Sequence, residues 1–296
     1  MASNVSQEKL LFYAAAGGLG GFAAWGLSEP FAYLNGYVLG IRAFWFHDAL
    51  LGAIAGALIA AFLASIEALS VGQLRQASRG FLAGAMFGSV GGAVGTVVGE
   101  ILFGFFHGLV GRILGWSVLG IAVGLAVGSA FGSATRRRNA IVGGLVGGAM
   151  GGFFYETLTR NFPQAFGRAI AIIILGALIG FFIGLVGELL KRGWLMVVRS
   201  QSRNAREGRE YPLSKPVTII GRAEESDIGL FGDQSVLGSH AIIRREGKNF
   251  VISPTGGQIF VNRQPVAGRH ALKSGDRLEV GGTLFLFRER AQAATR

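Results

Sequence analysis

Residues 169–198 read AIAIIILGALIGFFIGLVGELLKRGWLMVV, and two kinds of structure meet within them. The run Ala169–Leu190 is apolar apart from Glu188, and it is long enough for a helix to cross the ~30 Å hydrocarbon core of a bilayer. After three further residues, a run of β-forming residues begins at Trp194. The stretch therefore predicts a membrane helix that ends near residue 192 and leads at once into a soluble β domain.

The sequence before this stretch contains five more apolar runs. Backbone polar groups find no water inside a bilayer, so such runs should be helical despite their many glycines. The composition agrees, because 51% of the chain is hydrophobic and only 15% is charged, against about 25% in ordinary domains. Residues 1–192 are thus predicted to form an α-helical membrane domain of about six transmembrane helices, at Leu10–Leu27, Ala49–Ala68, Phe81–Phe103, Leu114–Gly132, Ala140–Phe154 and Ala169–Leu190.

The helical region also carries an internal repeat. Its first, third and fifth runs share the pattern G-x-x-G-G followed by seven residues and a glutamate, at Gly17–Glu29, Gly88–Glu100 and Gly144–Glu156. The second, fourth and sixth runs carry a glycine at every fourth position. The second glycine of each G-G pair precedes the first such glycine by 31, 28 and 28 residues. This regularity predicts three tandem helical hairpins.

Glycine at every fourth position lines one face of a helix and lets two backbones approach closely in a membrane. The simplest role of these glycines is therefore tight helix packing. The repeated glutamates Glu29, Glu100 and Glu156 allow two interpretations. They are solvated by water and headgroups at the helix ends, or they form a ring that binds a cation or lines a pathway.

The basic residues of the short loops predict the orientation in the membrane. Arg75 and Arg79 lie between the second and third helices, Arg136–Arg138 lie between the fourth and fifth, and Lys191 and Arg192 follow the sixth. Because such residues favour the cytoplasmic side, we expect a multi-pass protein of the inner cell membrane with both termini in the cytoplasm. The basic C-terminal region is expected to face membrane lipid headgroups, and no nucleic-acid partner is expected.

Downstream of residue 192 the pattern becomes that of an all-β sandwich over residues 193–290, with a short tail at 291–296. Short β-rich runs alternate with turn residues. The predicted strands are Trp194–Val198, Glu210–Leu213, Val217–Ile220, Ala241–Arg244, Phe250–Ile252, Ile259–Val261, Leu278–Val280 and Thr283–Phe287.

Several short motifs in this region resemble a forkhead-associated (FHA) domain when taken in order. They are Gly221-Arg222 at the end of a strand, Asp227-Ile228-x-Leu230, His240-Ala241, Phe260-Val261-Asn262 and Gly275-Asp276-Arg277. The resemblance covers about the last hundred residues. It implies a β-sandwich whose loops read phosphothreonine peptides. The apolar helical domain resembles no family that we can name.

The resemblance also indicates which residues would meet a phosphate. Arg222 matches the phosphate-binding arginine of the family, and a guanidinium suits a doubly charged phosphate. The Ser-Arg-x-His motif of the family reads Leu237-Gly238-Ser239-His240 here, and the usual Asn-Gly loop is replaced by residues 254–258. Candidate substitutes for the missing hydroxyl are Ser235, Ser239 and Thr255. His240 is expected to support the fold.

Two functions follow as expectations. The first is a membrane-anchored interaction or scaffold module whose FHA-like domain binds a protein partner at the cytoplasmic face, either through a phosphothreonine or independently of phosphate. The second is a channel or transporter regulated by that domain. No enzyme activity, catalytic residue, metal or cofactor is expected, because the chain has no cysteine and no phosphate-binding loop, nucleophile elbow or metal-ligand cluster. The protein could act as a homo-oligomer or as a subunit of a membrane complex.

Overall fold

The computed structural model describes residues 2–32, 40–70, 73–130, 133–247 and 249–290. The predicted tail at 291–296 and the predicted helix end at Gly132 lie outside these ranges. The described chain forms two compact units, a helical one and a β one, and each is considered by itself.

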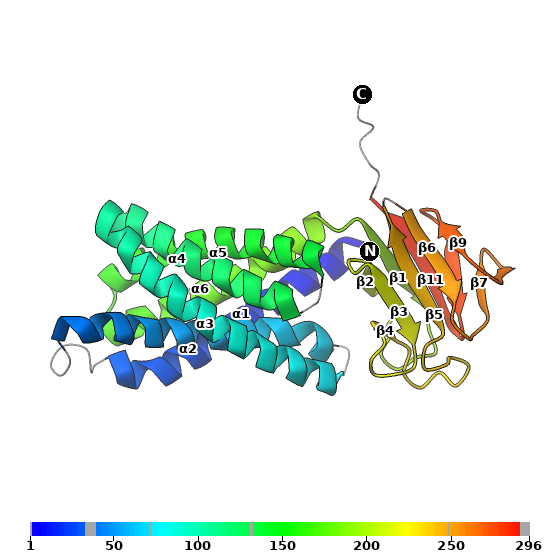
Figure 1. The fold of residues 1–296 in the computed structure, drawn as a ribbon, viewed down its shortest axis with the longest axis horizontal. Helices are drawn as coiled ribbons and strands as arrows, with labels where there is room; N and C mark the ends of the chain where they lie inside the picture. The colour runs from blue at the N-terminus through cyan, green and yellow to red at the C-terminus, as the bar shows by residue number, and fades with distance from the viewer. Residues whose placement is uncertain (1, 33–39, 71–72, 131–132, 248, 291–296) are drawn as a thin grey trace, which may run out of the picture. The chain divides into compact units, whose positions relative to one another are not determined.

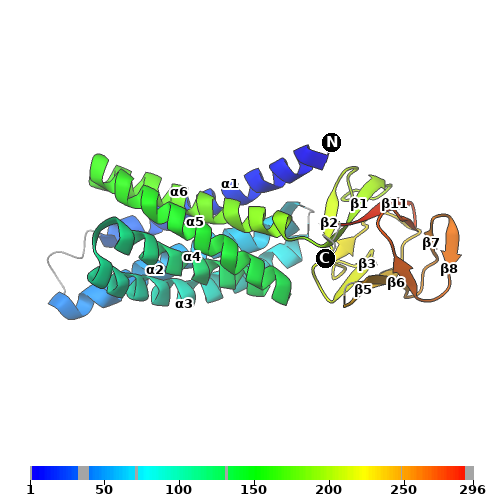
Figure 2. The same cartoon turned by 90° about the horizontal axis from the view of Figure 1, so that it is seen from above.

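Six α-helices make up the helical unit, and all six are long and apolar enough to cross a membrane. The predicted helical membrane domain is thereby confirmed as six helices. Most of them extend past the predicted apolar runs; α5, for example, also includes Arg136–Arg138 before its run and Thr157–Asn161 after it. Their bounds are α1 Ala2–Ala32, α2 Gly40–Ser70, α3 Leu74–Phe106, α4 Gly108–Ala130, α5 Ala134–Asn161 and α6 Gln164–Leu189 (Figures 1 and 2).

The repeated glycines determine how these helices pack. In α5, Gly144 and Gly148 face the preceding helix α4, whereas Gly147 faces the following helix α6. The helix α3 uses its three glycines in the same way between α2 and α4. In α1 the first and third glycines face α6 and the middle one faces α2. The three hairpins therefore close into a ring in which α1 packs against α6.

Several of the close approaches between helices are reciprocal pairs of glycines. A Cβ added to Gly144 would lie 2.1 Å from the carbonyl oxygen of Gly120, and one added to Gly120 would lie 2.1 Å from that of Gly144. The pairs Gly88–Gly56 and Gly17–Gly176 make the same reciprocal contact. Gly56, not Gly52, is therefore equivalent to Gly120 and Gly176, and the first hairpin is one helical turn longer than the sequence spacing suggested.

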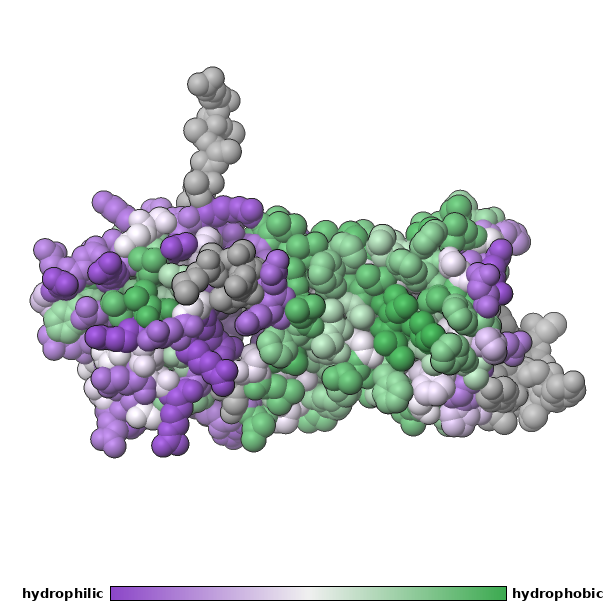
Figure 3. Space-filling model, turned by 180° about the vertical axis from the view of Figure 1, so that it is seen from behind, coloured by the Kyte–Doolittle hydropathy of each residue, from purple (hydrophilic) through white to green (hydrophobic). Residues whose placement is uncertain are grey.

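Apolar side chains fill the centre of this bundle. Ile59 of α2, Leu119 of α4 and Leu175 of α6 are fully buried in one cluster. Large apolar side chains also cover the outside, especially on α3, where Leu82, Met86 and Val90 are exposed. The visible surface of the helical unit is mostly hydrophobic, whereas that of the β unit is largely hydrophilic (Figure 3). This distribution suits a lipid-facing exterior.

The β unit is a sandwich of two sheets, as predicted. One sheet has the order β2-β1-β11-β10-β7-β8 and the other β4-β3-β5-β6-β9. All pairs are antiparallel except β3 with β4. The bounds are β1 Gly193–Arg199, β2 Glu210–Pro212, β3 Val217–Gly221, β4 Ile228–Gly229, β5 Ala241–Glu246, β6 Asn249–Pro254, β7 Ile259–Val261, β8 Gln264–Val266, β9 His270–Leu272, β10 Arg277–Val280 and β11 Thr283–Glu289.

Alternating side chains of the two sheets build a separate core, which includes the fully buried Leu195, Ile220, Phe285 and Phe287. Eight strands were predicted, and the structure adds β4, β8 and β9. These three strands have only two or three residues each, which is too short for an alternating pattern to show.

Candidate functional site

Loops at one end of the sandwich bring most of the predicted contact residues together. Arg222 directly follows β3, and its backbone N–H donates to the Leu237 carbonyl at 2.8 Å. The Ala223 N–H donates to the carbonyl of Gly238 at 3.1 Å. The Arg222 side chain is exposed, and it has no ion pair or hydrogen bond within the described part of the chain. It is therefore available to an incoming anion.

Two of the three candidate hydroxyl groups meet at this end. The Ser239 Oγ lies 3.4 Å from the Thr255 Oγ1, which joins the loop before β5 to the loop after β6. Leu237 lies between Arg222 and these hydroxyls in sequence, and 47% of its surface is exposed. An added Cβ at Gly256 would lie 3.2 Å from the Leu237 side chain. An exposed leucine thus occupies the position where the FHA pattern has a serine.

The third candidate, Ser235, is instead hydrogen-bonded to Asp233 in its own loop. Its Oγ and its backbone N–H both donate to Oδ1 of Asp233, at 2.5 and 3.0 Å. The Asp233 Oδ2 accepts from the Gly282 N–H at 2.7 Å, so this carboxylate ties the loop to the turn between β10 and β11. Burial raises the pKa of Asp233, but these hydrogen bonds and nearby His240 outweigh that effect and hold the pKa below its usual value.

His240 connects the same loops through hydrogen bonds, as expected for a residue that supports the fold. Its Nδ1 accepts from the Leu237 N–H at 3.1 Å, and its Nε2 lies 3.0 Å from the Gln258 carbonyl, to which it donates. Both ring nitrogens are occupied and only 3% of the side chain is exposed. The residue therefore fixes the loop geometry and does not face a ligand.

Sequence reasoning missed the residues that brace the other loops. Asn204 donates from Nδ2 to the Gly229 carbonyl and accepts at Oδ1 from the Phe231 N–H. Asp227 accepts from Lys215 Nζ at 2.5 Å and from the Ile219 N–H at 2.9 Å. Asp227 belongs to the motif Asp227-Ile228-x-Leu230, but Asn204 lies in a segment without a recognisable pattern.

In the helical unit, arginines neutralise the three repeated glutamates. Glu29 accepts from Arg168 at 2.7 Å. Glu100 and Glu156 share Arg112, at 3.1 and 3.5 Å, and Glu156 also pairs with Arg160 at 2.5 Å. Among the described residues, no group of three His, Cys, Asp or Glu side chains is placed to hold a metal ion. The geometry favours ion pairing between helices as the role of these glutamates.

The glycine register explains why one arginine serves two glutamates. Arg112 and Arg168 each lie eight residues before the reciprocal glycine of their helix, and the equivalent position in the first hairpin is Asp48. Glu156 pairs with Arg112 of the preceding helix α4, and Glu29 of α1 pairs with Arg168 of α6, which precedes α1 in the ring. For Glu100 the equivalent position on the preceding helix α2 is Asp48, and Glu100 pairs instead with Arg112 of the following helix. The ion pairs thus break the symmetry that the glycines keep.

A second ionic network at the opposite helix ends was not predicted. Lys9 lies 3.0 Å from Glu188 and 3.5 Å from Glu67, the Tyr13 hydroxyl donates to Glu67 at 2.7 Å, and Arg136 also pairs with Glu67. Glu67 and Glu188 thus connect the ends of α1, α2, α5 and α6.

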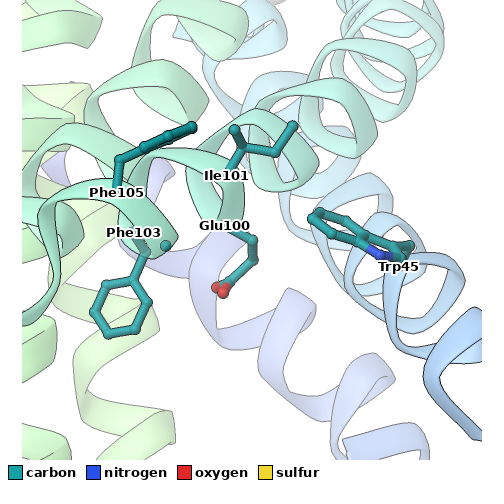
Figure 4. A pocket seen from close by; sticks show the side chains of 6 residues that line it. Trp45, Glu100, Ile101, Phe103 and Phe105 are labelled. Carbon is teal, nitrogen blue, oxygen red and sulfur yellow. The ribbon is translucent and has the colours of Figure 1, made fainter.

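A pocket of about 450 Å³ lies between the C-terminal part of α3 and Trp45 of α2 (Figure 4). In this view Glu100 extends between the Phe103 ring and Trp45. The Arg112 guanidinium lies 4.2 Å from the centre of the Phe103 ring. Glu100 is the one carboxylate among the described residues that line this pocket, and it is already paired with Arg112.

Residues 204–291 match the family described as "inner membrane component of T3SS, cytoplasmic domain". The chain is 35% identical over 103 residues to an oxoglutarate dehydrogenase inhibitor from Corynebacterium diphtheriae, an alignment that covers 34% of this chain and 68% of that protein.

Solved structures of small β domains also match the C-terminal third. The domain of a Chlamydia trachomatis protein is 25% identical, with 34% of this chain and 99% of that one covered and a TM-score of 0.30. The N-terminal domain of Rad53p from Saccharomyces cerevisiae, solved with a phosphothreonine peptide, is 18% identical, with 33% and 94% covered and a TM-score of 0.29.

Proposed function

Because the chain belongs through its C-terminal domain to the forkhead-associated family, we propose that it is a membrane-anchored protein-interaction module whose partner docks on the loops around Arg222. The observation that carries this proposal is an exposed guanidinium, without an ion pair to any described residue, on the same braced loops as an exposed leucine. A positive charge next to an apolar side chain is a common arrangement at protein interfaces, where arginine is enriched. The helical unit would keep this surface at the membrane.

The same loops suggest what the partner presents. Arg222, Ser239 and Thr255 could together donate to a phosphothreonine, whereas Leu237 offers an apolar contact where the family has a hydroxyl. We propose that the partner segment makes both contacts, with its charge on Arg222 and an apolar side chain on Leu237. The curated relative is named as an inhibitor of another protein, which fits a function performed by binding.

The channel or transporter alternative gains no supporting observation. The centre of the helical unit is filled by buried apolar side chains, and Glu29, Glu100 and Glu156 are paired with arginines. These contacts favour an anchoring role for the helices.

A paired peptide library tests the proposal. Full-length protein in nanodiscs would be incubated with peptides that contain a central threonine in phosphorylated and unphosphorylated forms. Selected peptides should lose about tenfold or more in affinity with Arg222→Ala, because a hydrogen bond to a charged group contributes about 1.5–3 kcal/mol. The matched control is Arg244→Ala, because Arg244 is an exposed arginine on β5.

The two forms of the peptide separate the chemistries. Selection of phosphorylated peptides only would make the domain a phosphothreonine reader, and equal selection of both forms with sensitivity to Leu237→Ala would make it independent of phosphate. If no peptide were enriched, or if Arg222→Ala and Arg244→Ala had the same effect, the loops would not be the docking surface.

A further inference from the structure

The outer face of the six-stranded sheet carries a groove that none of the observations above uses. Its volume is about 600 Å³. The side chains that line it come from β1, the loop after β1, the turn between β7 and β8, β10 and β11. They are Val198, Arg199, Glu207, Asn262, Arg263, Arg277, Glu279 and Leu284. Arg222, Ser239 and Thr255 lie on loops of the other sheet, so the two surfaces are separate.

A β-bulge forms one wall of the groove. In the pairing of β1 with β11, Val197 lies opposite Phe285 but Arg199 lies opposite Leu284, so one residue is inserted between them. A bulge breaks the in-and-out alternation of a strand. Val198 and Arg199 are consequently both exposed, and both line the groove.

The turn between β7 and β8 forms the opposite wall. Asn262 and Arg263 both have positive φ, at 52° and 67°, as the two-residue hairpin turn requires. The Asn262 side chain accepts from the Arg277 N–H at 2.9 Å and donates to Asp276 at 2.8 Å. These bonds fix the start of β10, from which Arg277 projects.

The charged side chains of the groove have no oppositely charged partner among the residues that the structure describes. Arg199, Arg263 and Arg277 have no ion pair with any described residue, and neither do Glu207 and Glu279. The three arginines are exposed, and Leu284 and Val198 supply the apolar part of the lining. A positive majority beside apolar side chains complements a segment that has acidic residues on either side of an apolar one.

We propose that this groove is a second docking site, which binds an acidic, partly apolar segment of a partner protein. The proposal deepens the interaction function proposed above and rests on it. A partner held at both the Arg222 loops and this groove would gain affinity by avidity, since the second contact becomes intramolecular. Binding at the groove should weaken with salt, because its charges are exposed and therefore screened.

Fluorescence anisotropy with a defined probe tests the groove. The probe is the labelled, unphosphorylated peptide EEVEEVEEVEEV, added to full-length protein in phosphatidylcholine nanodiscs, and KKVKKVKKVKKV is its matched control. We expect saturable binding of the acidic peptide only. The double variant Arg199→Glu/Arg277→Glu should weaken it at least tenfold, whereas Arg244→Glu, with the same charge change on the other sheet, should alter it less than twofold.

Four outcomes would overturn the proposed docking site. The two peptides could bind equally, or the acidic peptide could fail to bind. Arg244→Glu could also weaken the acidic peptide as much as Arg199→Glu/Arg277→Glu does, or Arg222→Ala could weaken it when the groove variant does not. If the double glutamate variant does not fold, the Arg199→Gln/Arg277→Gln pair should still weaken the acidic peptide. The threonine library contains the test of the Arg222 loops, so either surface can fail without the other.

Discussion

Single polar residues hold the contact loops of the β unit in place. Asp233 accepts three hydrogen bonds from two loops, and His240 uses both of its ring nitrogens. Neither side chain is exposed enough to meet a partner. The loop residues that are exposed, Arg222 and Leu237, can therefore vary in chemistry while the loop shape is kept.

The pKa of Asp233 predicts a dependence of stability on pH. Its folded pKa lies below the unfolded value of about 3.9. The carboxylate therefore stabilises the fold above that value, and its contribution is lost as the pH falls through the folded pKa. Asp233→Asn should lower the melting temperature of the β unit at pH 5–7, and the difference from wild type should shrink toward pH 3. Thermal unfolding followed by circular dichroism measures this.

The control for that series is Glu207→Gln, because Glu207 is exposed and has no partner among the described residues. It should leave the melting temperature almost unchanged at every pH. A difference between Asp233→Asn and wild type that stayed constant down to pH 3 would contradict the role given to the carboxylate.

At the level of helices, backbone contact between glycines replaces side-chain packing. Gly56, Gly88, Gly120 and Gly144 place carbonyl oxygens where a Cβ would otherwise lie. Such close approach suits helices in lipid, where apolar side chains gain little from packing against one another. Because these glycine faces already contact other helices of the same chain, they are not available for contact between subunits of an oligomer.

The substitution Gly144→Ala tests this packing. Its Cβ would lie 2.1 Å from the Gly120 carbonyl oxygen, so α4 and α5 must move apart, and overpacking of this kind costs about 1–3 kcal/mol. We expect a lower melting temperature in detergent. Gly104→Ala in α3 is the matched control, because nothing lies within 4 Å of its added Cβ. Equal effects of the two substitutions would contradict the proposed contact.

The sequence predicted the classes of both units and the glycine faces, because both depend on local periodicity. It could not predict which helices those faces join, since that depends on the register between hairpins. The pairing of Glu100 with Arg112 follows from that register and from Asp48 in the first hairpin. The groove on the β unit was also missed, because a bulge and a turn create it from residues that are ordinary surface positions in sequence.

At the scale of the whole molecule, the absence of cysteine makes orientation directly measurable. The helix α5 has 28 residues, which gives a length of about 42 Å, so its two ends should lie on opposite sides of the membrane. Arg138→Cys near its start should resist a membrane-impermeant thiol reagent in intact cells, and Asn161→Cys at its end should react. Both positions are exposed.

Permeabilised cells provide the control, because both cysteines should then react. Reaction of Arg138→Cys alone in intact cells would reverse the proposed orientation and place the β unit outside the cytoplasm. Reaction of both in intact cells would show that α5 does not cross the membrane.

Because α1 packs against α6, the first and last hairpins of the chain are neighbours in space. Lys9 near the start of the helical unit lies 3.0 Å from Glu188 near its end, and the glycine contacts between α1 and α6 match those between α2 and α3. We therefore expect that the helical unit tolerates circular permutation. A rearranged gene that encodes α3 to α6 first and then α1 and α2 would specify the same set of helix contacts.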